Sequence, residues 1–306
     1  MTPTANSPVF ANRYDFVYLF DCKDGNPNGD PDMANTPRFD PETFQGIVSD
    51  VCLKRKIRDY VFADKSQNGK PERGYDIFVL QGHSLESRQQ MPYGNLAELK
   101  DKANGNATER GDVDKARSWM CENFFDIRAF GAVMSTTDFN CGQVRGPVQI
   151  TFARSIDRVL ATEHGITRVA YTKEEKKQST SAQTEMGNKH TVAYGLYRTH
   201  GFVNPSLADL PKGTGFGEMD LAVLWKALMN MFDLDRSASR GLMACRGLWV
   251  FKHESKLGNA PAHKLFELIK VSAKKEPPRE FSDYQVEAPA DGPVAGFPGV
   301  SVKRLA

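Results

Sequence analysis

The sequence predicts an α+β fold of the ferredoxin-like type, enlarged by insertions. Two strongly amphipathic helical segments, at Asp40–Tyr60 and Glu218–Asp233, are separated and flanked by segments with strand-like alternation. Once the insertions are set aside, the order is strand, helix, strand, strand, helix, strand. The chain contains no internal repeat, and its 306 residues suit one elaborated domain over 1–306.

The first strand and the first helix carry the clearest patterns. In Tyr14–Asp21 every second residue is aromatic, which predicts a strand with one apolar face. A loop rich in Gly, Pro, Asn and Asp follows at Cys22–Arg38. Asp40 and Pro41 suit the start of a helix that runs to about Tyr60. Its predicted apolar face consists of Phe44, Ile47, Val48, Val51 and Cys52.

The middle of the chain is predicted as strands interrupted by an insertion. Asp76–Gln81 reads as the second strand, and about 84–125 as an irregular and helical insertion in which Asp114–Asn123 forms a short helix. Two further strands are expected at Asp126–Val133 and Val144–Arg154.

The region from about 160 to 200 is predicted to form a long hairpin arm. Its strands are Ile166–Thr172 and Thr191–Val203, and the polar segment Lys173–His190 between them is too hydrophilic for a core. Beyond the second amphipathic helix, the remaining predicted elements are a last strand at Gly247–His253, a short helix at Ala262–Lys270 and an extended C-terminal surface tail over 276–306.

Composition narrows the class of protein. No apolar run reaches the ~18–20 residues of a membrane span, and the first ten residues do not resemble a secretory signal. Five cysteines without a C-x-x-C pair favour a reducing cytoplasm and argue against a zinc knuckle. The net charge is only +2, so a nucleic-acid-binding role requires cations gathered on one face.

Two loops invite a ligand interpretation. Asp24–Asp32 resembles half of a calcium-binding loop, but Asn35 stands where a bidentate Glu is needed, so we expect no metal there. A structural, turn-rich loop is favoured over a nuclease metal site, which would need a second acidic cluster. Gly213–Gly217 matches no nucleotide-binding motif and is expected to be a flexible connection. We therefore predict no cofactor, and the absence of a catalytic signature favours binding over catalysis.

The end of the first helix is unusually basic. Lys54, Arg55, Lys56 and Arg58 lie within five residues. Cations at a helix C-terminus also complement the helix dipole, which is the alternative explanation. Because a dipole does not require four cations, we favour contacts with backbone phosphates.

Positive charge also gathers between residues 141 and 200, where nine Lys and Arg face five acids. Met186, with Lys189 and His190 close by, could insert between bases while cations hold phosphates; a surface loop with solvated charges is slightly favoured. Arg145 stands beside Gly146-Pro147, which fits an edge-strand bulge and a close approach of RNA about equally. The strand order is one that RNA-recognition modules share, although Arg128–Val133 is a poor match to their aromatic motif.

Six segments, in order along most of the chain, resemble the backbone subunit of the type I-C CRISPR Cascade complex, a member of the RAMP superfamily. They are Asn26–Asp32, Pro37–Asp40, Val48–Tyr60, Asp126–Val133, Gly142–Gln149 and His190–Arg198. The resemblance implies an RRM-like palm that carries guide RNA and a hairpin thumb at about 160–200 that reaches a neighbouring copy. It favours Lys54, Arg55, Arg58 and Lys189 as RNA contacts. The other predicted RNA-binding residues are Lys56, Arg128, Arg145, Met186, His190 and Arg198.

The same resemblance implies partners and an alternative. The implied partners are CRISPR guide RNA, further copies of the chain, other Cascade subunits, target DNA bound through base pairing, and a separately recruited helicase-nuclease; no membrane is implied. The alternative function is a RAMP-superfamily endoribonuclease that processes repeat RNA, for which Asp30, Asp32 and His190 are the residues to test. The resemblance favours the non-catalytic role.

Overall fold

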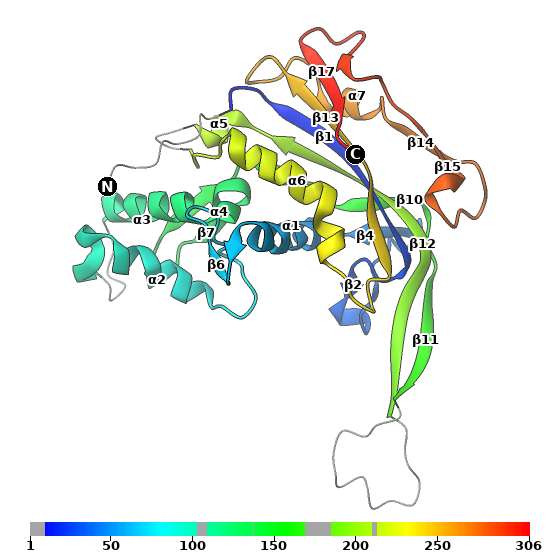
Figure 1. The fold of residues 1–306 in the computed structure, drawn as a ribbon, viewed down its shortest axis with the longest axis horizontal. Coiled ribbons are helices and arrows are strands. Elements are labelled where there is room, and N and C mark those ends of the chain that lie inside the picture. The colour runs from blue at the N-terminus through cyan, green and yellow to red at the C-terminus, as the bar shows by residue number, and fades with distance from the viewer. Residues whose placement is uncertain (1–9, 103–108, 137, 169–184, 210–212) are drawn as a thin grey trace, which may run out of the picture.

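A large antiparallel sheet organises the molecule. The computed structural model describes residues 10–102, 109–136, 138–168, 185–209 and 213–306. The sheet has nine strands in the order β16-β17-β13-β1-β12-β10-β4, and β9 and β11 pair with β12 beside this path (Figure 1). At its centre β1 (Tyr14–Gly25) pairs with β12 (Glu185–Val203) on one side and with β13 (Leu242–His253) on the other. The first predicted strand is confirmed.

The remaining elements are as follows. The longer helices are α1 (Asp50–Asp64), α2 (Leu85–Asn95), α3 (Arg110–Asn123) and α6 (Glu218–Leu234), and the short ones are α4 (Phe125–Phe130), α5 (Pro205–Ala208) and α7 (Ala262–Phe266). The other sheet strands are β4 (Gln45–Val48), β9 (Val148–Ile150), β10 (Ala153–Arg158), β11 (Ala161–Arg168), β16 (Gly292–Pro293) and β17 (Val300–Arg304). Small separate hairpins are formed by β2 (Gly29–Asp30) with β3 (Thr36–Pro37), β5 (Ser66–Gln67) with β6 (Lys70–Pro71), β7 (Gly131–Met134) with β8 (Gly142–Arg145), and β14 (Lys270–Ala273) with β15 (Tyr284–Glu287).

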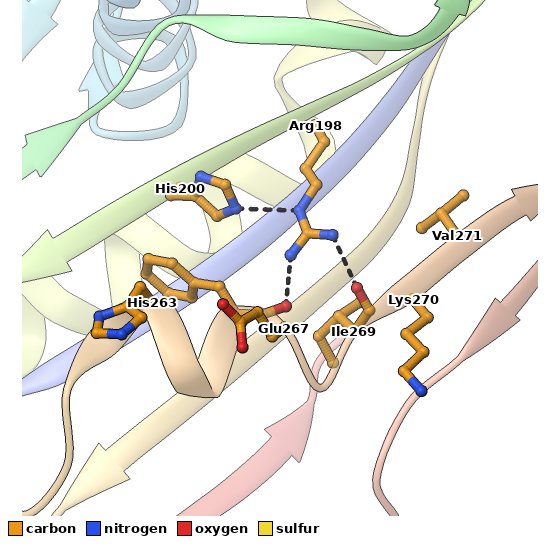
Figure 2. Close-up of a pocket in the computed structure, with 8 residues that line it drawn as sticks. Arg198, His200, His263, Glu267, Ile269, Lys270 and Val271 are labelled. Carbon is orange, nitrogen blue, oxygen red and sulfur yellow. Dashed lines mark hydrogen bonds between the residues drawn. The ribbon is translucent and has the colours of Figure 1, made fainter.

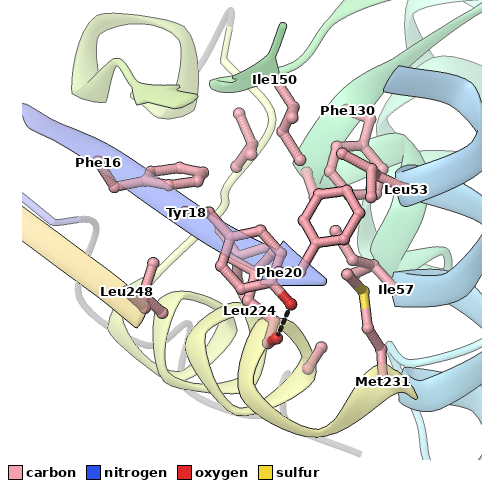
Figure 3. Packing of buried hydrophobic residues seen from close by; sticks show 14 of the residues in the cluster. Phe16, Tyr18, Phe20, Leu53, Ile57, Phe130, Ile150, Leu224, Met231 and Leu248 are labelled. Atoms are coloured by element: carbon pink, nitrogen blue, oxygen red, sulfur yellow. Dashed lines mark hydrogen bonds between the residues drawn. The ribbon is translucent and has the colours of Figure 1, made fainter. Parts of the chain in front are cut away.

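Helices α1 and α6 cover one face of the sheet. The alternating aromatic residues of β1, Phe16, Tyr18 and Phe20, point toward these helices and are fully buried against side chains such as Ile57 and Leu224 (Figure 3). The Tyr18 hydroxyl donates a 2.6 Å hydrogen bond to the Leu228 carbonyl, which satisfies its only polar group in the core. Burial of this aromatic stripe is the main force that fixes the helices on the sheet.

The opposite face of the sheet has its own core. Val17 and Leu19 of β1 pack there with Trp249 and Phe251 of β13, and residues of α7 and of β15 close over them. Residues 276–306, expected as an extended surface tail, contain β17, which pairs with β13 and buries Val300 and Val302. The surface over this face is therefore formed largely by the last fifty residues.

The first helix begins ten residues later than predicted. Asp40 accepts hydrogen bonds from the Glu42 and Thr43 amides, but it caps only a tight turn, because Phe44 has φ of 57° and breaks the helical path. The next residues form β4, which pairs with β10, and Ser49 caps α1. The predicted helical positions of Phe44, Ile47 and Val48 are therefore wrong, and Val51 is 64% exposed.

Of the other predicted strands, one is wrong, one is correct only at its end and one is divided. Within Asp76–Gln81 only Asp76 forms an isolated bridge, and Asp126–Val133 is the helix α4 followed by β7. The buried Asp126 carboxylate accepts the Phe78 and Val79 amides, so these two segments are held by a side chain instead of a ladder. The predicted strand Val144–Arg154 is divided among β8, β9 and β10, with Pro147 between the first two.

The insertion and the arm are separate features. Residues of α2, α3 and α4 form a hydrophobic cluster of their own beside the sheet. β11 and the first part of β12 pair as a hairpin that projects beyond the sheet (Figure 1). Residues 169–184, including the expected strand end and Lys173, Lys176 and Lys177, lie outside the described residues. Among the residues that the structure describes, no helix is long and apolar enough to cross a membrane.

Candidate nucleic-acid interface

The loop after β1 is held in place by hydrogen bonds and an ion pair. The Asn28 side-chain oxygen accepts hydrogen bonds of 2.9 Å from both the amide and the hydroxyl of Ser49, so the loop holds the residue that caps α1. Asp30 accepts from the Asp32 amide and forms a 3.0 Å ion pair with Arg38. No three His, Cys, Asp or Glu side chains are placed to share a metal ion in the described part of the chain.

The four predicted cations lie in the middle of α1 and not at its end, because the helix continues to Asp64, and they are largely neutralised by carboxylates. Lys54 pairs with Asp50 at 2.8 Å, and Arg58 pairs with the buried Asp126 at 2.7 Å. Both cations also lie over the Phe130 ring, at 5.7 and 5.3 Å from its centroid. These two predicted phosphate contacts therefore also connect α1 with α4.

Arg55 differs from its neighbours. Its side chain is 56% exposed, and the one ion pair that it forms with a described residue is a 3.4 Å contact with Asp59 one turn later on the same helix. Val51, one turn earlier, is also exposed. Because exposed pairs of this kind contribute little free energy, Arg55 can exchange its carboxylate for a phosphate at small cost.

Lys56 is part of a buried link between α1 and the loop after α6. Only 2% of the residue is exposed, and its ammonium contacts Asp235, which also lies 3.5 Å from Arg240. Burial, assisted by Arg240, lowers the pKa of Lys56 to about 8, while the Asp235 carboxylate favours the charged form. Lys56 is placed to position backbone segments, and its ammonium does not face solvent.

Arg240 extends this link to the loop after β1. Its guanidinium donates to the carbonyls of Asn26 and Pro27 at 3.0 and 3.3 Å, and the Asn26 amide donates to Ser239. The Lys189 ammonium of the arm donates to the Ala238 carbonyl. We call the set formed by 26–28, 49–56, 235–241 and Lys189 the arm junction.

Asp235 and Arg240 were missed by the sequence reasoning. The segment Asp235–Gly241 has two arginines around a Ser-Ala-Ser core directly after a helix, which was the available signal. The exposed apolar side chains of Met33 and Phe44 lie in the segment that follows Asn28, and exposed Leu242 follows the 235–241 loop. Val51, one turn from Arg55, and Leu242, next to Gly241, place exposed apolar side chains at the arm junction, and apolar side chains beside cations suit a single-stranded nucleic acid.

The two faces of the arm carry different side chains. Directly opposed residues of an antiparallel pair share one face, so His164 with Lys189 and Ile166 with Gly187 lie on the same side. Glu163 with His190 and Thr167 with Met186 lie on the other. Since Lys189 reaches Ala238, its side faces the junction, and Met186, which is 78% exposed, is on the outward side.

Arg128 and Arg145 have contrasting surroundings. Arg128 is buried, and it donates to Asp220 at 2.8 and 2.9 Å and to the carbonyls of Cys121 and Gly74. Arg145 is exposed at the end of β8. An approach of RNA to the Gly146 backbone is blocked, because a Cβ there would lie 2.3 Å from the Phe130 carbonyl carbon.

Arg198 closes the end of α7 on the other face of the sheet. Its terminal nitrogens donate to the carbonyls of Phe266 and Ile269, and Nε donates to His200 Nε2 at 3.0 Å (Figure 2). The His200 ring stacks on Phe266 with centroids 4.4 Å apart, and burial together with Arg198 lowers the pKa of His200 to about 4. These residues line an open pocket of about 630 Å³ with His263 and Lys270.

The ten predicted RNA contacts are therefore not one cluster. Lys54, Lys56, Arg58, Arg128 and Arg198 are engaged with carboxylates or carbonyls inside the fold. Arg55 and Lys189 lie at the arm junction, Met186 and His190 lie on the outward side of the arm, and Arg145 is at the end of β8. The junction combines cations, apolar side chains and a projecting hairpin at one place.

Comparison with known proteins identifies the family. The profile of the CRISPR-associated protein Cas7 family matches residues 12–289. A CRISPR-associated protein Cas7 of Haloferax volcanii is 29% identical over 242 residues; the match covers 72% of this chain and only 65% of that relative. A chain of a CRISPR RNA-guided surveillance complex in a pre-nicking state aligns with a TM-score of 0.51 and 12% identity over 78% of both chains, which shows a shared fold. A chain of another CRISPR RNA-guided surveillance complex aligns with a TM-score of only 0.41, at 14% identity over 78% of this chain and 68% of that one. The chain belongs to the CRISPR-associated protein Cas7 family.

Proposed function

We propose that this chain is a non-catalytic backbone subunit of a type I-C CRISPR surveillance complex, and that copies of it assemble along the guide RNA. Membership of the Cas7 family supports the assignment. The observation that carries it is the arm junction, where α1, the loop after β1, the loop after α6 and the arm are linked by Lys56, Arg240 and Lys189. The six segments that resemble type I-C subunits support the subtype.

The sheet is the proposed RRM-like palm. The strands β13, β1, β12 and β10 are neighbours in that order, and α1 and α6 lie on one face. Numbered by their place in a βαββαβ chain, these strands have the order 4-1-3-2, which is that of a ferredoxin-like sheet. This arrangement supports a palm whose helical face presents Arg55 and the arm junction to the phosphates of the RNA.

The hairpin of β11 and β12 is the proposed thumb. Its inward side carries Lys189, which donates to the Ala238 carbonyl at the arm junction. This position supports a contact with guide phosphates in the same copy. Its outward side carries Met186, which is available to a neighbouring copy and to the bases between two copies. Such a thumb interrupts the guide at intervals, and the bases between thumbs pair with target DNA. Other complex subunits, a recruited helicase-nuclease and a cytoplasmic location complete the proposal.

The loop after β1 supports the non-catalytic part of the proposal. Asp30 is paired with Arg38, and Asn28 is committed to capping α1 through Ser49. An RNA-cleaving role would require these groups to face a scissile phosphate. Incubation of the protein with repeat RNA and Mg²⁺ tests this point: intact RNA is expected, and cleavage that Asp30→Asn or Asp32→Asn abolishes would contradict it.

Co-expression with a repeat-spacer RNA tests assembly. Electron microscopy of the purified material is expected to show elongated particles that contain RNA and several copies of the chain. The variant Arg55→Ala with Lys189→Ala should lose RNA from these particles, while Lys252→Ala with Lys303→Ala removes two exposed cations elsewhere as the matched control. RNA-free monomers of the unaltered protein at low salt would contradict the proposal. Assembly with the other subunits of a type I-C complex, and not with those of another subtype, tests the subtype.

A further inference from the structure

The Asp235 carboxylate is shared by two cations from different parts of the chain. Asp235 lies directly after α6 and contacts the Lys56 ammonium, which belongs to a side chain that is only 3% exposed. The same carboxylate lies 3.5 Å from Nε of Arg240. Neither cation forms an ion pair with any other carboxylate in the part of the chain that the structure describes. Because an enclosed charge needs a counter-charge, both cations depend on Asp235.

The loop after α6 and the loop after β1 are in direct backbone contact. The Asn26 amide donates a 2.8 Å hydrogen bond to the Ser239 carbonyl. A Cβ at Gly25 would lie 2.0 Å from the Arg240 carbonyl oxygen, so this close approach requires a glycine. Across the same contact, Nη1 of Arg240 donates to the carbonyls of Asn26 and Pro27. The two loops therefore form one packed unit.

The arm meets this unit at its base. β1 ends at Gly25, which pairs with Val192 of β12, and beyond that pair β12 continues into the arm with β11 as its partner (Figure 1). The Lys189 ammonium reaches the loop after α6 and donates to the Ala238 carbonyl. Because an ammonium has more than one N–H donor, Lys189 can keep this contact and bind a phosphate as well. The position of the loop after α6 therefore decides where the ammonium of the arm lies relative to Arg55.

We propose that Asp235 is a positioning residue for the guide RNA. It fixes the loop after α6 through Lys56 and Arg240. That loop in turn holds Lys189 in the place from which it and Arg55 reach phosphates of the same strand. Asp235 itself does not touch the RNA, because its carboxylate is mostly covered and would repel phosphates. This role presupposes guide RNA binding, so it rests on the proposed function.

Asp235→Asn tests this role through the sign of its effect. The variant removes a negative charge from the arm junction, so electrostatics alone predicts tighter RNA binding. A positioning role predicts binding that is weaker by about tenfold, with an unchanged salt slope because no phosphate contact is removed. Filter binding of a repeat-spacer RNA at several salt concentrations measures both quantities. Asp233→Asn is the matched control: it removes the same charge from a 72% exposed side chain nearby, and the affinity should stay within about twofold.

Arg240→Lys tests the same role without changing charge. Nε of Arg240 faces Asp235 while Nη1 donates to the two carbonyls, and the single nitrogen of a lysine cannot occupy both places. The Arg240 side chain is 22% exposed, so this variant should fold even if Asp235→Asn, which leaves Lys56 enclosed without its carboxylate, does not. We expect the affinity to fall by about threefold or more at an unchanged salt slope. Unchanged affinity here, or tighter binding by Asp235→Asn, would overturn the proposal.

Hydrogen exchange of the protein without RNA separates positioning from a general loss of stability. In both variants the Asn26 amide and the amides of 236–241 should exchange about fivefold faster or more, because the contact between the two loops opens more often. The amides of Phe16 to Phe20, in the middle of β1, should keep their rates. Uniformly faster exchange, or unchanged exchange in the two loops, would overturn the role of Asp235. An unaltered protein that never binds guide RNA would instead count against the proposed function, and the exchange rates would still show whether Asp235 fixes the loop.

Discussion

The basic middle part of α1 and the hairpin arm use their cations in different ways. In α1, Lys56 and Arg58 are enclosed by the fold and paired with Asp235 and Asp126. In the arm, Lys189 contacts only a backbone carbonyl, and no described ion pair involves it. The first helix lies between the sheet, α6 and the insertion, whereas the arm is a two-stranded ribbon with few neighbours.

This difference indicates which cations are available for RNA. A cation that the fold encloses must have a partner, because an unpaired buried charge is costly. A cation on an exposed ribbon stays hydrated without a carboxylate partner, so it remains available to bind a phosphate. The α1 residues that a sequence pattern marks most strongly as phosphate contacts are therefore mainly structural, with Arg55 as the exception.

The largest expected effect is the loss of stability when an enclosed cation of α1 is removed. Arg58→Ala leaves the buried Asp126 without its charged partner, although two backbone amides still donate to it. We expect the free energy of unfolding to fall by about 3 kcal/mol, measured by urea denaturation. Arg55→Ala should change it by less than about 0.5 kcal/mol. Similar stability in the two variants would show that the buried pair does not anchor α1.

The next effect concerns the outward side of the arm. Met186→Ala removes an exposed apolar side chain that we expect to pack between bases or against a neighbouring copy, so the affinity for guide RNA should fall about tenfold, or ~1.4 kcal/mol. Stability should not change, because the side chain packs on little in one copy. Filter binding measures the first quantity and thermal unfolding the second. Met186→Leu is the control and should retain most of the affinity. Normal RNA binding by the Ala variant would show that this side of the arm contacts neither bases nor a neighbouring copy.

Arg55→Ala sharpens the comparison within a single helix. We expect a loss of RNA affinity of about fivefold, with the salt slope reduced by ~0.7, since one single-strand phosphate contact disappears. Lys54→Ala is the matched variant: its side chain is mostly covered by Asp50 and Phe130, and its slope should change less. A larger slope change for Lys54 than for Arg55 would reverse the assignment.

The sequence predicts the long helices and strands of this fold better than the residues at which they begin and end. The aromatic alternation of β1 and the apolar stripe of α6 place both elements correctly, because each pattern reflects a single buried face. The start of α1 could not be predicted, since Asp40 and Pro41 form a proper N-terminal signal, and only Phe44 with its positive φ ends the turn. The pairing of β4 with β10, more than a hundred residues away, decides the outcome.

The candidate site was less predictable for a related reason. A sequence shows that Lys56 and Arg128 are cations, but not that Asp235 and Asp220 lie beside them. These pairs join residues about ninety or more positions apart. The role of a cation such as Arg55 or Lys189 is easier to predict from sequence, because among the described residues no carboxylate distant in the sequence pairs with it.

The smallest expected effect tests the structural role of Arg198, which the sequence grouped with the RNA contacts. His200 accepts a hydrogen bond from Arg198, and burial lowers its pKa from 6.5 to about 4. Between these values the unfolded chain binds a proton that the folded chain resists, so stability is complete above pH 6.5 and falls as the pH decreases toward 4. At pH 5.5 the loss should be about 0.7 kcal/mol, with the shift discounted by half for partial exposure. Urea unfolding between pH 7 and 5 measures it.

His200→Gln should flatten the pH dependence in this range, and His263→Gln, which removes an exposed histidine from the same pocket, should not. If both variants keep the full slope, the protons are taken up elsewhere, and the Arg198–His200–Phe266 contact does not set the acid stability of this face of the sheet.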